Sequence, residues 1–135
     1  LIADLQLLKQ NNDIELPNYD FAVHNRTSHT TSFQTVDLCI VEGILPIYTA
    51  QLIECYDQTY YLDVPLETCL ERRKTRDIEE RGRTEACVQE QFDKTVIPGF
   101  KQFISSQKSR AQFQVSSSKD TATLTANLND VLKRA

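Results

Sequence analysis

Residues 60–83 read YYLDVPLETCLERRKTRDIEERGR, an apolar run followed by a strongly charged helical pattern. The aromatic and β-branched residues of Thr59–Val64 predict a strand. Pro65 suits the first position of a helix, where no backbone N–H is needed, and the pattern predicts a helix over about Pro65–Asp77. Gly82 marks the break after that helix. A strand followed directly by a helix is the unit from which parallel α/β sheets are built.

The rest of the chain continues this alternation. Val36–Val41 (VDLCIV) predicts a short buried strand, and Ala111–Val115 predicts another. Earlier in the chain, Ile14–Asp20 predicts an extended segment, with Pro17 barring a central position in a sheet, and Phe21–Ser32 predicts a second extended arm or a loop. Helical patterns cover Leu1–Gln10, Leu45–Cys55, a stretch capped by Thr84 and interrupted at Pro98-Gly99, and Thr121–Ala135. The predicted fold class is α/β, a parallel sheet with flanking helices.

Length and composition limit the classes of function that this sequence could have. The 135 residues predict one domain, residues 1–135, and 40% hydrophobic content is enough for a core. A net charge of −4 argues against nucleic acid or an anionic membrane as partner, and no apolar run approaches the roughly 20 residues of a membrane span. The four cysteines form no CxxC pair and lie near neither histidine, which argues against zinc. They read as reduced core residues of a cytoplasmic protein.

The strongest local feature is the segment Glu71–Arg83, which holds six cations and four acids. Arginines converging beside the glycine could clamp phosphates through bidentate hydrogen bonds. The alternative is a solvated helix with ion pairs at i,i+4 spacing. Arg73 favours the first interpretation because it falls on the apolar face of the helix, where an unpaired charge is costly.

Two further features could carry chemistry. Glu42 directly follows the predicted strand Val36–Val41, and ligands of open α/β sheets bind at the carboxyl ends of strands. A carboxylate there could hold Mg²⁺, or it could simply be exposed. The segment Pro17–Arg26 (PNYDFAVHNR) contains two aromatic residues, a histidine and an arginine, which could grip a planar base. The alternative interpretation of this segment is a polar hairpin with one core aromatic residue.

These segments together resemble the uridine–cytidine kinase family, within the phosphoribulokinase and uridine kinase group of P-loop kinases. The similarity runs over nearly the whole chain and rests on an ordered set of motifs: PNYDFAVHNR, VDLCIVEGIL and YYLDVPLETCLERRKTRDIEERGR, followed by the helix from Gln91 to Pro98. The resemblance implies a P-loop NTPase-type sheet. It also implies a nucleoside kinase of pyrimidine salvage, which transfers the γ-phosphoryl group of ATP to the 5′-hydroxyl of uridine or cytidine with Mg²⁺.

The resemblance also assigns roles to individual positions. The hairpin of residues 14–32 would cover the nucleoside, and residues 71–83 would form an arginine-rich lid. The site residues that it implies are Tyr19 and His24 at the base edge, Phe21 packed on the base, Arg73, Arg83 and Gln91 on the nucleoside, Arg76 and Arg81 on the phosphates, Asp120 near the ATP base, and Glu42 on Mg²⁺.

The chain also departs from the family pattern. Its only glycines are Gly43, Gly82 and Gly99, so these 135 residues contain no GxxxxGK[ST] phosphate loop. The loop and the aspartate that acts as general base are expected upstream of Leu1, which makes the fold of this chain incomplete and the chain alone inactive. Without the phosphate-loop strand, Val36–Val41 would expose an apolar edge unless a further N-terminal segment, a partner or a second copy in a homo-oligomer covered it.

Two alternatives to a uridine–cytidine kinase remain open at this stage. The first is a non-catalytic nucleoside-binding or regulatory relic of a kinase. The second is a relative that acts on another hydroxyl substrate, such as a sugar phosphate. The hairpin of residues 14–32 argues against the second alternative, because a sugar phosphate offers no base to stack.

Overall fold

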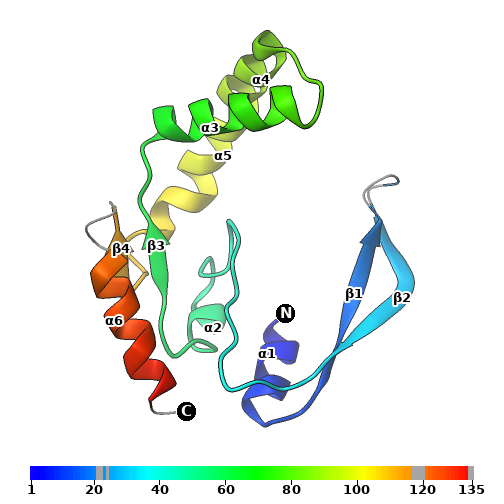
Figure 1. Ribbon diagram of the computed structural model, residues 1–135, viewed down its shortest axis with the longest axis vertical. Helices are drawn as coiled ribbons and strands as arrows, with labels where there is room; N and C mark the ends of the chain where they lie inside the picture. The colour runs from blue at the N-terminus through cyan, green and yellow to red at the C-terminus, as the bar shows by residue number, and fades with distance from the viewer. Residues whose placement is uncertain (21–22, 24, 117–120, 134–135) are drawn as a thin grey trace. The chain divides into compact units, whose positions relative to one another are not determined.

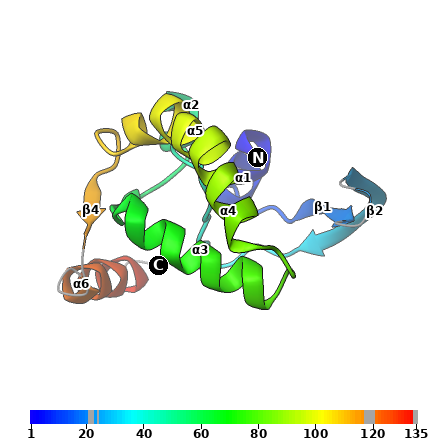
Figure 2. The same ribbon diagram turned by 90° about the horizontal axis from the view of Figure 1, so that it is seen from above.

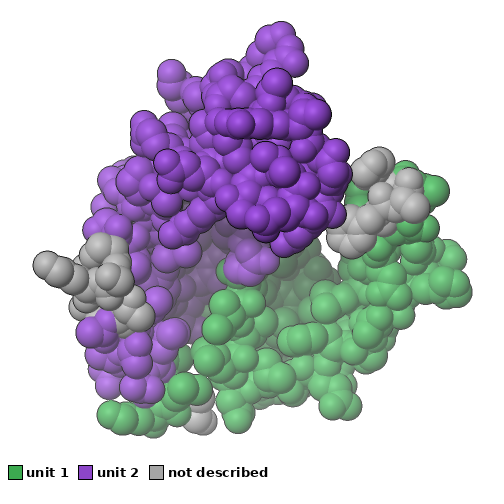
Figure 3. Space-filling model, turned by 45° about the horizontal axis from the view of Figure 1, so that its top comes forward, with its two compact units in different colours: residues 1–41, 131–135 green, residues 42–130 purple. Residues whose placement is uncertain are grey.

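The computed structural model describes residues 1–20, 23, 25–116 and 121–133. The chain forms two compact units, which Figure 3 colours separately: unit 1 comprises residues 1–41 and 131–135, and unit 2 comprises residues 42–130. Helices occur in both units, and unit 2 holds a small parallel sheet, so the architecture is mixed α/β. Within the described ranges, no helix combines the length and the apolar character that crossing a membrane requires.

Unit 1 begins with the predicted N-terminal helix, α1 (Ile2–Lys9). Leu5 is its buried residue. The helix ends in a turn at Asn11, which adopts the left-handed backbone conformation with φ 58°. Asparagine tolerates this conformation better than most residues do, so the helix stops where the polar run Asn11–Asp13 begins.

The two extended arms form the antiparallel hairpin β1 (Ile14–Asp20) and β2 (Asn25–Phe33), drawn in blue and cyan in Figure 1. The pairing register shifts between Pro17 and Tyr19, because proline has no N–H to give to the ladder. Ile14 is the buried residue of β1, while the β2 residues are exposed apart from half-buried Phe33. The prediction of an extended segment is confirmed for Ile14–Asp20 and, in the second segment, from Asn25 to Ser32.

The prediction of a buried strand at Val36–Val41 is wrong. This segment carries no strand, and the side chain of Ile40 is 71% exposed. A β-strand forms only where a neighbouring strand shares its backbone hydrogen bonds. Within the described parts of the chain, no strand pairs with residues 36–41. The apolar, β-branched composition that favoured a strand is therefore not sufficient on its own.

Unit 2 contains the other two predicted strands, β3 (Tyr60–Leu62) and β4 (Phe113–Val115), paired in parallel. Tyr60 lies opposite Phe113 in the register, and the two rings stack with centroids 5.0 Å apart. The predicted C-terminal helix follows β4 as α6 (Thr121–Leu132). The helix expected over Leu45–Cys55 is reduced to α2 (Ala50–Ile53), capped by the Thr49 hydroxyl.

The predicted helix after β3 is α3 (Leu66–Glu79), and the chain then turns at Gly82, whose φ of 61° suits glycine. Thr84 caps the next helix, α4 (Glu85–Gln91), as expected, and its hydroxyl accepts a hydrogen bond from the Cys87 N–H at 3.3 Å. Figure 1 shows α3 and α4 as an arm at one end of unit 2, and Figure 2 shows α3 from above.

The expected interruption at Pro98-Gly99 does not occur. The helical path from α4 continues through η1 (Phe92–Val96), α5 (Ile97–Gly99), η2 (Phe100–Ile104) and η3 (Ser105–Gln107). η1 and η2 are π-helical, with hydrogen bonds that join residues five positions apart. Pro98 lacks the N–H that an α-helix would give to the carbonyl four residues earlier, and the wider turns on either side let the helix continue.

The core of unit 2 lies along this long helix. Val88 and Phe92 are buried four residues apart on one face, with exposed fractions of 0% and 4%. Further along, the buried Gln107 amide donates hydrogen bonds to the Ile44 carbonyl at 2.9 Å and the Phe103 carbonyl at 3.1 Å. The amide ties the segment after Gly43 to the end of the helix and satisfies its own buried N–H groups.

We expect Phe92→Ala to lower the free energy of unfolding by about 3–5 kcal/mol, because it removes a buried aromatic side chain and leaves a cavity. Urea unfolding followed by far-UV circular dichroism measures this loss. The matched control is Ile78→Ala, at an apolar position of α3 that is 42% exposed, with an expected change within about 0.5 kcal/mol. Equal losses in both variants would contradict the location of the core.

Candidate functional site

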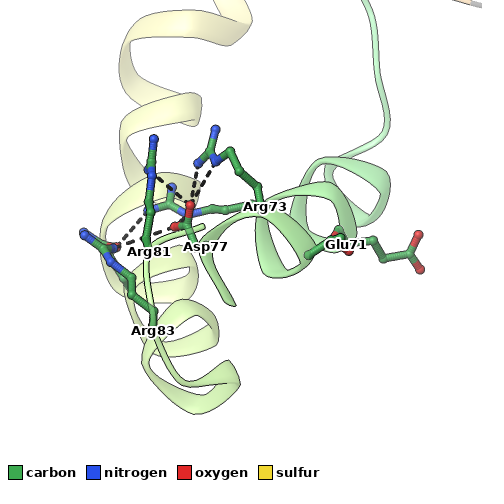
Figure 4. A network of polar contacts seen from close by, with 8 residues as sticks. Glu71, Arg73, Asp77, Arg81 and Arg83 are labelled. Carbon is green, nitrogen blue, oxygen red and sulfur yellow. Dashed lines mark hydrogen bonds and ion pairs between the residues drawn. The ribbon is translucent and has the colours of Figure 1, made fainter. Parts of the chain in front are cut away.

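The end of α3, the turn at Gly82 and the start of α4 gather four arginines around one aspartate (Figure 4). Helical geometry explains part of this arrangement, because Asp77 lies four residues after Arg73 and four before Arg81. The turn brings the chain back, and the Arg83 N–H donates to the Asp77 carbonyl at 3.1 Å. We call Arg73, Arg76, Arg81 and Arg83 the arginine cluster.

The carboxylate of Asp77 is the centre of the cluster and is fully buried, with 0% exposed. Its Oδ1 accepts hydrogen bonds from Arg76 Nε at 2.9 Å and from Arg81 Nη1 at 3.1 Å. Its Oδ2 lies 3.4 Å from Arg73 Nε and 3.8 Å from Arg83 Nη1. Oδ2 and Arg73 Nε are both buried and make no hydrogen bond, so their interaction is an ion pair.

Gln91, at the end of α4, provides a second acceptor. Its Oε1 receives hydrogen bonds from Arg73 Nη2 at 2.8 Å and from Arg83 Nη1 at 2.7 Å. Asp77 Oδ1 therefore holds Arg76 and Arg81, whereas Gln91 Oε1 holds the other two arginines. The cluster is divided into two pairs, each fixed by its own oxygen atom.

The protonation state of Asp77 follows from its neighbours. Burial alone would raise the pKa of the Asp77 carboxyl. The hydrogen bond from Arg76 and the neighbouring guanidinium charges outweigh burial and hold this pKa below its usual value of 3.8. Asp77 is therefore ionised at neutral pH, and four guanidinium groups with one carboxylate leave the cluster a net charge of +3.

This positive charge reaches solvent. The side chain of Arg81 is 51% exposed and that of Arg76 is 46% exposed, whereas that of Arg73 is only 23% exposed. A guanidinium group has five N–H donors, and the contacts to Asp77 use one in Arg81 and two in Arg76. The remaining donors could bind an anion with several oxygen atoms, such as a phosphate.

A further ion pair connects the two helices of the arm. Lys74 Nζ of α3 lies 2.9 Å from Glu85 Oε1 in the first turn of α4. The hydrogen bond and the charge of Lys74 lower the pKa of the Glu85 carboxyl from its usual 4.5. Because Glu85 also complements the positive end of the α4 dipole, it stays ionised and helps to hold α4 against α3.

The structure brings together five of the ten site residues that the sequence predicted: the arginine cluster and Gln91. Tyr19 lies on β1 with its side chain 47% exposed, opposite Arg26 of β2. Glu42 is exposed in the irregular segment before α2. The remaining three, Phe21, His24 and Asp120, lie outside the described residues. Among the residues that are described, no three His, Cys, Asp or Glu side chains converge to hold a metal ion.

Asp77 is the site residue that sequence reasoning missed. It was counted only among the acids of a charged segment. Its spacing of four residues from both Arg73 and Arg81 was a usable signal, because an acid in that position faces both side chains on one side of a helix.

The family model described as "Phosphoribulokinase / Uridine kinase family" matches residues 1–124. The chain is 45% identical over 108 residues to a uridine kinase of Proteus mirabilis (strain HI4320), covering 80% of this chain and 51% of that protein. It is 41% identical over 115 residues to a uridine kinase of Vibrio atlanticus (strain LGP32), covering 85% of this chain and 54% of that protein. The chain thus spans about half the length of these relatives.

The depressed pKa of Asp77 predicts an acid-dependent loss of stability. A carboxyl whose pKa is lower in the folded state stabilises that state at every pH above its unfolded value, near 3.8, and this contribution disappears as pH falls through the folded pKa. Asp77→Asn should therefore be less stable than the unmodified chain at neutral pH, and the difference should shrink progressively below about pH 4.

Thermal unfolding of both proteins between pH 7 and about pH 3 measures this effect. Glu79→Gln is the matched control, because it removes the same charge from an exposed position two residues away in α3. A stability difference between Asp77→Asn and the unmodified chain that stays constant with pH would contradict an ionised Asp77 in the folded state.

Proposed function

Because the chain belongs to the phosphoribulokinase/uridine kinase family, we propose that it supplies the nucleoside site and the phosphate lid of a uridine kinase-like enzyme. The reaction is ATP-dependent phosphorylation of the 5′-hydroxyl of uridine or cytidine, a step of pyrimidine salvage. The observation that carries this proposal is the arginine cluster, with four guanidinium groups fixed around Asp77 and a net positive charge open to solvent.

Arg76 and Arg81 are the proposed phosphate-binding pair. Transfer of a phosphoryl group demands positioning and neutralisation of charge on the phosphate oxygens rather than covalent chemistry from the protein. These two side chains are about half exposed, and both are oriented by Asp77 Oδ1. They would stabilise the charge that spreads over the transferred group.

Arg73, Arg83 and Gln91 are the proposed nucleoside contacts. Both arginines donate hydrogen bonds to Gln91 Oε1. The amide N–H groups of Gln91 are then available to a sugar or base oxygen. A separate set of contacts for the nucleoside and for the phosphates matches the division of the cluster into two pairs.

The hairpin of residues 14–32 is proposed to recognise the base, through Tyr19, Phe21 and His24. The antiparallel pairing of β1 and β2 supports a hairpin at this place. A histidine at the pyrimidine edge would discriminate against a base that left its hydrogen bond unmade. Asp120 is proposed to lie near the ATP base.

Glu42 is the proposed protein ligand of Mg²⁺. A single exposed carboxylate fits this ion, because Mg²⁺ keeps several waters and commonly takes one or two carboxylates together with substrate phosphates. When bound, Mg²⁺ would neutralise charge on the phosphates of ATP. Glu42 would orient the ion from the end of the segment that begins at Val36.

The proposed fold is a P-loop NTPase-type parallel sheet that these 135 residues build only in part. Two observations support it: β3 and β4 pair in parallel, and the apolar segment Val36–Val41 has no strand partner within the described residues. The sequence holds no GxxxxGK[ST] loop, so we expect this chain alone to be inactive. A further segment or a second copy would complete the sheet.

The cytoplasmic location stays a prediction from the cysteine pattern.

The proposal is tested with the isolated chain and with a chimera. In the chimera, the matching 108-residue stretch of the Proteus mirabilis uridine kinase is replaced by that of this chain. We expect no uridine monophosphate from the chain with uridine and ATP, and sustained turnover from the chimera. In the chimera, Arg81→Ala should lower kcat/KM by about tenfold to a hundredfold, because one charge on the phosphates is lost.

Arg72→Ala is the matched control, because Arg72 is an exposed arginine of α3 outside the cluster. Equal losses for Arg81→Ala and Arg72→Ala would contradict the lid assignment. Turnover by the isolated chain would overturn its proposed inactivity. A chimera that binds uridine without turnover would favour the alternative, a non-catalytic nucleoside-binding relic of a kinase.

His24→Ala in the chimera should weaken uridine binding about tenfold, the effect of one lost hydrogen bond, and leave ATP binding nearly unchanged. Isothermal titration with each ligand measures the two affinities. His29→Ala is the control, since His29 is the other histidine of the chain and is exposed on β2. An equal loss of affinity for uridine and ATP would rule out a role for His24 at the base.

A further inference from the structure

We propose that Asp77 is a positioning residue for the arginine cluster: its buried carboxylate fixes the directions of the guanidinium groups, so that they bind a phosphate-bearing substrate together. The inference deepens the proposed function and rests on it. Asp77 itself would touch neither the substrate nor the transferred group.

The contacts show how one carboxylate can orient several side chains. Arg76 donates to Oδ1 through Nε at 2.9 Å and approaches it through Nη2 at 2.8 Å, so one edge of this guanidinium group faces the carboxylate. Arg81 donates to the same oxygen through Nη1 at 3.1 Å, from a position just beyond the end of α3. Arg76 is therefore held along its Nε–Nη2 edge and Arg81 through Nη1, and the remaining N–H groups of both are left for an anion.

Because Asp77 is buried, a substrate phosphate would not displace its carboxylate from the arginines. A substrate phosphate could displace an exposed carboxylate and take its place among the arginines. The Asp77 side chain has 0% exposure and lies within α3, and the Asp77 carbonyl also accepts the Arg83 N–H that closes the turn. The carboxylate is thus part of the framework, and an incoming anion adds to the cluster from the exposed side.

The Asp77 carboxylate offsets the repulsion between the four arginine side chains. Four like charges packed at the end of α3 would spread into solvent if nothing compensated them, because exposed arginine side chains have many rotamers. A site whose donors are already oriented binds more tightly than one whose donors must be ordered by the ligand. Asp77 would provide this preorganisation for the pair Arg76 and Arg81, and Gln91 would assist with the other two arginines.

Removing the carboxylate charge separates two explanations, because they predict opposite signs. If charge alone decided anion affinity, Asp77→Asn would strengthen binding, since the net charge of the cluster would rise from +3 to +4. If Asp77 positions the arginines, the same variant would weaken binding despite the added positive charge.

The experiment measures the affinity of the complete 135-residue chain for inorganic tripolyphosphate by isothermal titration at fixed ionic strength. We expect Asp77→Asn to bind at least about tenfold more weakly than the unmodified chain, in the direction opposite to the charge effect. The control Glu79→Gln removes the same charge from the exposed face and should bind equally or slightly more tightly. Asp77→Glu keeps the charge and should recover part of the lost affinity.

Equal or tighter binding by Asp77→Asn would overturn the positioning role and leave the proposed function standing. Failure of the unmodified chain to bind tripolyphosphate would instead overturn the phosphate role of the cluster, and the positioning role with it. These two failures are therefore distinguishable.

A second measurement covers the case in which Asp77→Asn does not fold. In the unmodified chain, the Nε–H signal of Arg76 is followed by NMR during titration with tripolyphosphate. We expect it to stay protected from exchange with water at saturation, because its bond to Asp77 persists. Loss of that protection at saturation would show that the anion displaces the carboxylate, and the positioning role would be wrong.

Discussion

A carboxylate without contact to water is the constraint on which the α3–α4 arm depends. Asp77 is ionised and buried, and a buried charge is tolerated only when ion pairs and hydrogen bonds replace its lost hydration. The groups that replace it come from α3, from the turn and from the residue before Thr84. The sharp turn at Gly82, the approach of α4 and the convergence of the arginines are therefore not independent features. The arginines surround Asp77, the turn brings Arg83 to it, and α4 adds Gln91, which holds Arg73 and Arg83.

The local elements could be predicted because their signals are local. The strand and helix of residues 60–83, the cap at Thr84 and the hairpin arms were all evident from short-range patterns. The segment Val36–Val41 could not be predicted in the same way, since a strand depends on hydrogen bonds to a partner distant in sequence. The helix through Pro98 was mispredicted because proline forbids one α-helical hydrogen bond and leaves wider turns possible.

The candidate site shows the same limit. The sequence pointed to the arginines as phosphate-binding residues, and five of its ten site residues do come together at the end of α3. The spacing of Asp77 from Arg73 and Arg81 is a signal in the sequence, but it does not show that this acid, rather than Glu79 or Glu80, is the buried one. Only the three-dimensional turn makes Asp77 buried and leaves its neighbours exposed. The roles of the individual side chains, and the single domain expected from length, stay predictions.

The irregular segment Val36–Val41 has a consequence for how the protein assembles in time. It combines strand-forming residues with backbone groups that no neighbouring strand occupies in the described chain, and Asp37 is the one charge within it. Such a segment can pair with a strand of another copy of the chain that reaches it during folding. Rapid overproduction would therefore favour self-association through this segment.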